Sequence, residues 1–236
     1  MDFERMWLEK LSLQLDEVKS KEFRKAAMKG SEKFSSSTAP GNVMRWTAGA
    51  VNKLKEELSE VELHDVVTGC ACHYPRAKLL SVRAAFRKSG SFPEAIDLLR
   101  KQFVESLRDG MLMDMEIVNK LLEMGMGVAG VLDGSRIIAV KIPKSGNLRK
   151  WIGEKDSQAR REMYCHCPRV NKAVKQGIRM PVEYCLCGAG FYRNIWETIT
   201  ESPVRVEVIE SVFDGDDRCC VAVYPYLLST DWRTEC

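Results

Sequence analysis

The sequence predicts an α+β protein with a helical N-terminal half, followed by a small mixed α/β domain with two antiparallel hairpins. Apolar residues recur at helical spacing through the first half of the chain. Beyond Gly125, apolar runs are separated by turns that contain Asp-Gly, which is a hairpin signal. We therefore expect a helical region at 1–125 and a cysteine-rich metal- and ligand-binding domain at 126–236.

The N-terminal half consists of amphipathic segments separated by turn residues. A serine-rich break lies at 35–41, and Ser-Gly at 89–90 ends a later segment. Ser91 is placed to cap the next helix, with Pro93 and Glu94 in its first turn. The predicted helices cover about 3–15, 42–58, 60–68, 75–88, 91–107 and 114–124.

The C-terminal half predicts two hairpins with helices between them. In the second hairpin, Arg205, Glu207 and Ile209 alternate with three valines, the period-two pattern of a half-buried strand. Glycines at 188 and 190 are expected to permit close packing at a helix start. The predicted elements are strands at 127–132 and 135–142, a polar helix at about 147–163, a helix at 188–200, and a hairpin that starts at Pro203 and turns at 214–217.

Composition and charge narrow the class of protein. The 236 residues are 45% apolar and 29% charged, as in an ordinary soluble protein. The N-terminus lacks the apolar region of a signal peptide, and no window approaches about 18 uncharged apolar residues. The net charge of +3 gives no electrostatic argument for a nucleic-acid or membrane partner. We expect a cytoplasmic protein, and a homo-oligomer is left open.

Three Cys-x-Cys pairs are the most informative feature of the chain. Nine cysteines without a secretory signature indicate soft-metal ligands or redox groups more than disulfides. The last two pairs are separated by 17 residues, a gap typical of zinc ribbons, although each pair has one intervening residue instead of two. The pairs are Cys70 and Cys72, Cys165 and Cys167, and Cys185 and Cys187.

The C-terminal cysteines predict one zinc site with at least three thiolate ligands. Zinc prefers four ligands in a tetrahedron, and positions i and i+2 of an extended segment share a face. Because the spacing within each pair is unusual, an alternative is that one cysteine of each pair binds while the last hairpin supplies another. Redox chemistry without metal and inert packing of buried thiols are further alternatives. The candidate ligands are Cys165, Cys167, Cys185, Cys187 and Cys219.

The first pair and its histidine form a weaker candidate site. Cys70, Cys72 and His73 lie between two predicted helices, far along the chain from the other pairs. They could complete the same site, form a second site with His64, act as a redox pair, or pack in a tight turn. A helix that begins near Pro75 would lower the pKa of a thiol at its N-terminus.

The stretch from Cys187 to Val223 resembles the end of 4-vinyl-reductase-type small-molecule-binding domains. It is also similar to the related segment of proteins grouped with L-2-amino-thiazoline-4-carboxylate hydrolase. The shared pattern is a helix, a strand bearing an acid, and a Gly215-Asp216 turn with Cys219 opening the last strand. In sensor members of the first group, cysteines and a glutamate of this region bind zinc beside a hydrophobic ligand pocket.

This resemblance implies that Cys219 is the final zinc ligand and that Glu207 or Glu210 is the acid. The family's cysteine just before the turn is Ser211 in this chain, so Cys185 or Cys187 and Cys165 or Cys167 would have to compensate. The hydrolase activity is not carried over, because the resemblance does not place its catalytic residues on this chain.

The leading functional hypothesis is a cytoplasmic zinc-binding protein that binds a small, largely apolar molecule in a sensor or binding role. One alternative is an enzyme, either a metal-assisted hydrolase or a thiol redox enzyme. Another is a structural zinc module in an interaction protein. The helix that follows Cys187 carries an apolar stripe that could form the wall of a ligand pocket or simply be a core face. The residues of this stripe are Phe191, Tyr192, Ile195 and Trp196.

Overall fold

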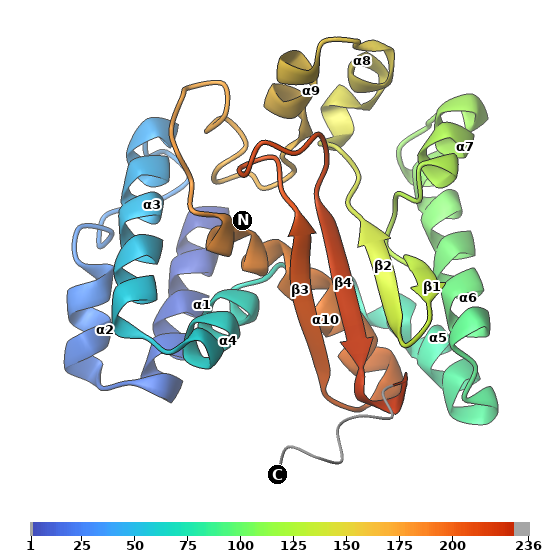
Figure 1. Ribbon diagram of the computed structural model, residues 1–236, viewed down its shortest axis with the longest axis horizontal. Helices are drawn as coiled ribbons and strands as arrows, with labels where there is room; N and C mark the ends of the chain where they lie inside the picture. The colour runs from blue at the N-terminus through green and yellow to red at the C-terminus, as the bar shows by residue number, and fades with distance from the viewer. Residues whose placement is uncertain (1, 229–236) are drawn as a thin grey trace.

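The computed structural model describes residues 2–228 and confirms the α+β class. A four-stranded antiparallel sheet of order β1-β2-β4-β3 lies in the centre, with helices beside both of its edges (Figure 1). Helices α1–α4 lie beyond the β3 edge and α5–α7 beyond the β1 edge, while α10 runs behind the sheet. The strands are β1 (Val131–Asp133), β2 (Arg136–Val140), β3 (Val204–Glu210) and β4 (Cys220–Pro225).

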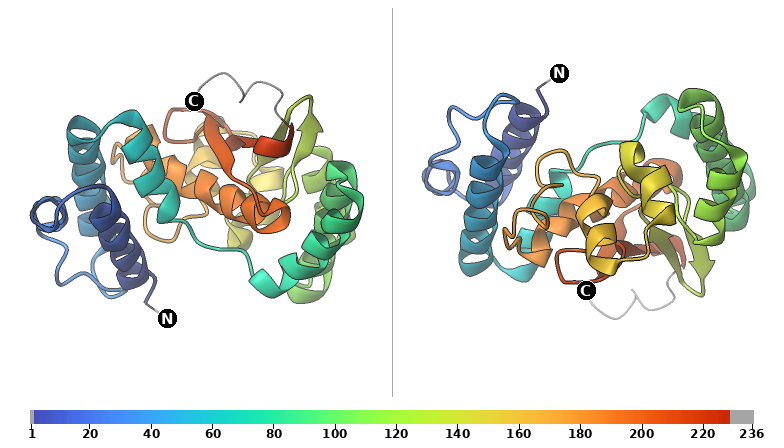
Figure 2. Two further views of the ribbon diagram at one scale, coloured as in Figure 1. Left: turned by 90° about the horizontal axis from the view of Figure 1, so that it is seen from below. Right: turned by 90° about the horizontal axis from the view of Figure 1, so that it is seen from above.

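Ten α-helices are formed within the described residues. Most follow the predicted segments, and the two views of Figure 2 show α8 and α9 at one end of the sheet. The helices are α1 (Phe3–Val18), α2 (Lys21–Met28), α3 (Pro40–Glu57), α4 (Glu60–Gly69), α5 (Arg76–Ser89), α6 (Phe92–Glu105), α7 (Met115–Glu123), α8 (Leu148–Gly153), α9 (Ser157–Tyr164) and α10 (Leu186–Thr200).

Local capping explains where several helices begin and end. Ser59 caps α4 in a reciprocal box with Glu62, which satisfies two backbone N–H groups. The predicted cap of α6 is confirmed, since the Ser91 hydroxyl accepts from the backbone N–H of Glu94. Helix α5 ends at Gly90, whose φ of 64° is in the left-handed region that glycine tolerates.

The single polar helix predicted at about 147–163 is wrong, because the segment forms α8 and α9. The Glu154 carboxylate accepts from the backbone N–H groups of Lys155 and Asp156. Asp156 then caps α9 by accepting from the N–H of Ala159. These local side-chain bonds replace the helical hydrogen bonds and break the helix. Helix α2 was not predicted.

The predicted alternation on β3 is confirmed by burial. Val204 and Val206 are buried against α10, whereas Arg205 and Ile209 are exposed on the opposite face. The β3–β4 pairing shifts register between Val208 and Glu210, so the strand is bulged near its end. The sheet therefore has one face covered by α10 and one that carries polar side chains.

Two apolar cores hold the chain together, and both include residues from either side of position 125. One joins α1, α3 and α4 to the cysteine-rich segments, with Leu15, Met44 and Cys187 among its members. The other lies between α5, α6, α10 and the sheet, and contains Leu99 and Trp196. The helical region and the cysteine-rich region thus share their cores.

No helix in residues 2–228 combines the length and the apolar character that crossing a membrane requires.

Candidate functional site

The end of β2, the start of β4 and the end of α9 meet at one end of the sheet and bring cysteines together there. Val140, the last residue of β2, pairs with Cys220, the first of β4. The backbone N–H of Lys141 donates to the Cys219 carbonyl at 3.0 Å. The hydroxyl of Tyr164, which ends α9 directly before Cys165, donates to the Lys141 carbonyl.

The side chain of Lys141 lies among these cysteines. Its Nζ lies beside Gly188 in the first turn of α10, where an added Cβ would approach it to 2.7 Å. Among residues 2–228 no carboxylate forms an ion pair with it. Burial acts to lower the pKa of Lys141, but nearby thiols in their charged form outweigh this and raise it. These thiols, called the thiol cluster below, are Cys165, Cys167, Cys185 and Cys219.

Each sulfur of the thiol cluster has an N–H or O–H group beside it. Burial raises the pKa values of Cys165 and Cys219, while the backbone N–H of Cys167 acts to lower the first and that of Val212 the second. Cys185, the N-cap residue of α10, lies 3.1 Å from the Ser211 hydroxyl. Such donors, together with the positive end of a helix, favour a thiolate over a thiol.

The fourth sulfur, on Cys167, is linked by hydrogen bonds to a buried ion pair that includes a residue of α1. Its sulfur lies 3.3 Å from the Tyr184 hydroxyl, which accepts from Arg169 at 3.3 Å. Arg169 also donates twice to the Glu4 carboxylate, at 2.7 and 2.8 Å, and stacks on Trp7 at 3.6 Å from the ring centre. Because Arg169 donates to the tyrosine oxygen, the hydroxyl proton is available to the sulfur.

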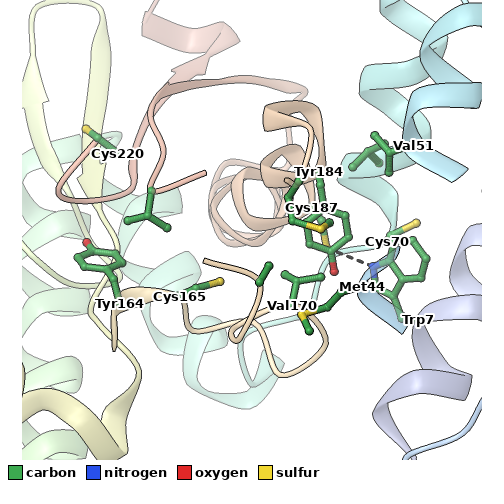
Figure 3. Packing of buried hydrophobic residues seen from close by; sticks show 14 of the residues in the cluster. Trp7, Met44, Val51, Cys70, Tyr164, Cys165, Val170, Tyr184, Cys187 and Cys220 are labelled. Atoms are coloured by element: carbon green, nitrogen blue, oxygen red, sulfur yellow. Dashed lines mark hydrogen bonds between the residues drawn. The ribbon is translucent and has the colours of Figure 1, made fainter. Parts of the chain in front are cut away.

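Cys187 lies on the α1 side of the same region. The indole Nε1 of Trp7 is 3.4 Å from the Cys187 sulfur, and since an indole N–H can only donate, the sulfur is the acceptor (Figure 3). Thus α1 supplies Trp7 to one cysteine directly, and Glu4 to another through Arg169 and Tyr184.

Burial favours the protonated form of Cys165, Cys185, Cys187 and Cys219. It raises the pKa of Cys185 and of Cys187 to about 12, and it raises that of Cys165 well above its ordinary value. The pKa of Cys219 is also raised, again mainly by burial. The cluster therefore becomes a nucleophile or a ligand set only when a cation compensates the charge of its thiolates.

The described residues contain no group of three or more histidine, cysteine, aspartate or glutamate side chains arranged to hold a metal ion. The chemistry of the cluster still suits a thiophilic cation, because its members are thiols with hydrogen-bond donors on their sulfurs. The zinc site expected from the cysteine spacing stays a prediction, and it requires the sulfurs to move closer together.

The structure pairs the two candidate glutamates with other residues. Glu207 accepts from the Tyr224 hydroxyl at 2.7 Å and forms an ion pair with Arg205. Glu210 is bound by both nitrogens of the Arg218 fork. Neither carboxylate has a hydrogen bond to a cysteine of the cluster.

The first cysteine pair lies on the α1 side, next to Cys187. Cys70 is buried in the same core as Cys187, and Cys72 is exposed. Burial lowers the pKa of His73, and Lys10 lowers it further. The proximity of this pair to the third pair could not be argued from spacing along the chain.

The four residues proposed to line an apolar pocket belong to a core. Tyr192, Ile195 and Trp196 are buried, and Phe191 packs against them. A cavity of about 460 Å³ lies between α1 and α2, and a smaller one of about 70 Å³ lies beside Phe103, but neither is lined by these four residues. A ligand pocket at this helix face stays a prediction.

The fold and the site define a class of protein, an α+β protein in which one buried and three half-buried cysteines lie around a lysine. No family model, no curated protein and no solved structure matches the chain. The resemblance of the C-terminal stretch to the 4-vinyl-reductase-type domains therefore stays a prediction.

Sequence reasoning missed Lys141, Arg169, Tyr184, Trp7 and Glu4. A lysine directly after the apolar run at 137–140 was a usable signal for the first of these, because a charge at such a position needs a partner. The others gave no signal, since Glu4 and Arg169 are separated by 165 positions.

The tyrosine that links the ion pair to Cys167 provides a first prediction. We expect Tyr184→Phe to lower the free energy of unfolding by about 1.5–3 kcal/mol, because Arg169 loses a buried acceptor. Tyr192→Phe is the matched control, with one bond to the carbonyl of Gly127, and should cost about 0.5–1.5 kcal/mol. Urea unfolding measures both, and equal losses would contradict a special role for Tyr184.

Proposed function

We propose that the chain is a zinc-binding protein in which Cys165, Cys167, Cys185 and Cys219 close around one ion. The observation that carries this proposal is that the four cysteines lie around Lys141, whose Nζ lies beside Gly188 at the start of α10 and has no carboxylate partner among residues 2–228. A buried ammonium without a counter-charge is costly, as is a set of buried thiolates without a cation. A divalent thiophilic ion with one lysine beside it balances most of this charge.

The chemistry of binding follows from the pKa values. Each ligand must lose its proton to bind, so binding releases protons and strengthens as the pH rises. Four thiolates around a doubly charged ion leave two negative charges, and the Lys141 ammonium reduces this excess. The donors on the four sulfurs would stabilise the remaining charge, as hydrogen bonds to thiolate ligands do at other metal sites.

The C-terminal resemblance supports zinc in particular, since Cys219 matches a zinc ligand of the sensor members. Ser211, the position where this chain departs from that pattern, lies 3.1 Å from the Cys185 sulfur. We infer that Cys185 takes the place of the missing cysteine.

The proposal also covers the cellular compartment and the role of the ion. All eight described cysteines are free, which supports a reducing compartment such as the cytoplasm. The four-sulfur set supports a binding or structural role for the ion more than hydrolysis, because a closed shell has no position for a water. Binding of a small apolar molecule near Trp196 would then require the core side chains there to rearrange.

Metal binding is tested by titrating chelator-treated protein with Zn²⁺ and with Co²⁺ as a spectroscopic probe. We expect one ion per chain and sulfur-to-cobalt charge-transfer absorption. Cys185→Ser and Cys219→Ser should weaken binding by at least about 100-fold. Because the pKa of Cys185 is about 12, apparent affinity should rise about tenfold per pH unit for each proton released.

Cys220→Ser is the matched control, because it removes a buried thiol next to Cys219 in the chain that is outside the thiol cluster. It should bind the metal as the wild type does. Substoichiometric zinc without charge-transfer absorption would end the proposal, and so would equal losses in Cys219→Ser and Cys220→Ser.

A further inference from the structure

The cavity of about 460 Å³ lies between α1, α2 and the loop that follows α2, and no cysteine lines it. Cavities of about 300–1,000 Å³ are the size that holds small organic ligands in proteins. One face of α1 forms a wall of this cavity, since the four residues that α1 contributes recur at helical spacing. These residues are Arg5, Leu8, Glu9 and Ser12.

The apolar part of the cavity wall is held in place by its neighbours. Leu8 is buried, and Met28 of α2 and Phe34 of the following loop are half-buried. The Phe34 ring packs edge-on against Trp46 of α3, with the ring centres 5.7 Å apart. The Trp46 indole N–H donates to the Lys29 carbonyl at 2.9 Å, which ties the loop to α3. A ligand therefore meets a wall that is already formed, so binding requires little further ordering.

Two adjacent cations of α2 border the same cavity. The Arg24 guanidinium donates to the Asp16 carboxylate at 2.6 Å and to the Ser12 hydroxyl at 3.3 Å, and both bonds use Nη1. Its Nη2 and Nε have no acceptor among residues 2–228. Lys25 is exposed and forms no ion pair within the same range. The cavity thus presents N–H donors of two positive side chains, which suit a carboxylate.

The two acids at the cavity differ in their partners. Both oxygens of Glu32 accept the backbone N–H of Gly30, at 2.9 and 3.0 Å. Glu9 is exposed and has no hydrogen bond or ion pair in the described part of the chain. Its carboxylate would repel an anion in the cavity, so removing its charge tests the sign of the ligand's charge.

We infer that this cavity binds a medium-chain fatty acid. Its carboxylate would be bound by Lys25 and by the open side of the Arg24 guanidinium, and its hydrocarbon chain would lie against the apolar wall. The site goes beyond the proposed zinc site and shares no residue with it. It is also separate from the apolar face of α10 at Trp196.

Isothermal titration calorimetry with octanoate, octanol and octylammonium tests the inference. We expect one octanoate per chain, and affinity should rise up to about fourfold for each methylene group between butanoate and octanoate. Octanol, which has the same chain without the charge, should bind at least about tenfold more weakly than octanoate. Octylammonium should bind more weakly still, because its charge is repelled by Arg24 and Lys25.

Four variants locate the site. Lys25→Gln should weaken octanoate binding by about fivefold or more. Lys21→Gln is the matched control, because it removes an exposed lysine of the same helix that does not line the cavity, and it should bind as the wild type does. Glu9→Gln should strengthen binding. Ser12→Phe, which places a ring in the cavity, should abolish binding, and thermal unfolding checks that the variant is folded.

Equal octanoate affinities of Lys25→Gln and Lys21→Gln would overturn the inference. So would octanol binding as tightly as octanoate, a wild-type protein that binds no octanoate at millimolar concentration, or full binding by a folded Ser12→Phe variant. If Ser12→Phe does not fold, the two lysine variants decide the question, because both side chains are exposed. All of these variants keep every cysteine, so the cobalt titration of the metal site is read separately.

Discussion

Replacing Arg169 with methionine is expected to lower the free energy of unfolding by about 3–5 kcal/mol, because it leaves the Glu4 carboxylate unpaired inside the protein. The two side chains are 3% and 5% exposed, which makes this the most buried ion pair of the described residues. The substitution also removes the hydrogen bonds that Arg169 donates to Thr47 and Tyr184. Urea unfolding of the variant measures the loss.

Two further variants make this prediction specific. Arg149→Met breaks the exposed pair with Asp114, so it should cost less than about 1 kcal/mol. Combining Arg169→Met with Glu4→Met should restore much of the loss, because no uncompensated charge is then buried. If Arg169→Met and Arg149→Met cost the same, the buried ion pair does not hold α1 against the cysteine-rich segment.

Gly190→Ala is expected to cost about 3 kcal/mol or more, because its Cβ would overlap the carbonyl of Thr68 on α4. That carbonyl is backbone, so α10 and α4 would have to separate. Their separation would also move the Cys70-Ala71-Cys72 loop away from Cys187. Thermal and urea unfolding measure the loss.

Gly49→Ala is the matched control for this substitution. Gly49 lies within α3, is exposed, and has no heavy atom within 4 Å of an added Cβ. Alanine should therefore stabilise α3 by about 0.5–1 kcal/mol through its higher helix propensity. A Gly190→Ala variant as stable as Gly49→Ala would show that α10 and α4 do not pack at this distance.

Much of the local structure could be predicted because its causes are close together in the chain. The Ser91 cap lies three positions from the N–H that it accepts, and the alternation on β3 follows from neighbouring residues. Where local signals compete, prediction failed. The polar segment at 147–163 has helical composition, but Glu154 and Asp156 bond their own backbone and divide it.

The candidate site could be predicted only in part. The cysteine pairs marked the segments that carry its chemistry, and the spacing of the last two pairs led to the zinc prediction. The spacing did not show which cysteine of each pair lies near Lys141 and which lies near α1. The structure places Cys165, Cys185 and Cys219 near Lys141, whereas Cys187 accepts from Trp7 and lies beside the first pair.

The sequence by itself determined the fold class, most helix limits, both hairpins and the thiol chemistry available to the chain, because these depend on residue type and local spacing. Only the tertiary structure decided which groups surround each sulfur. Lys141 reaches the cysteines through the pairing of β2 with β4, and Arg169 reaches Glu4 through the packing of the 165–180 segment on α1. These contacts join residues far apart in the chain, so no local pattern encodes them, and they set the charge balance at the thiols.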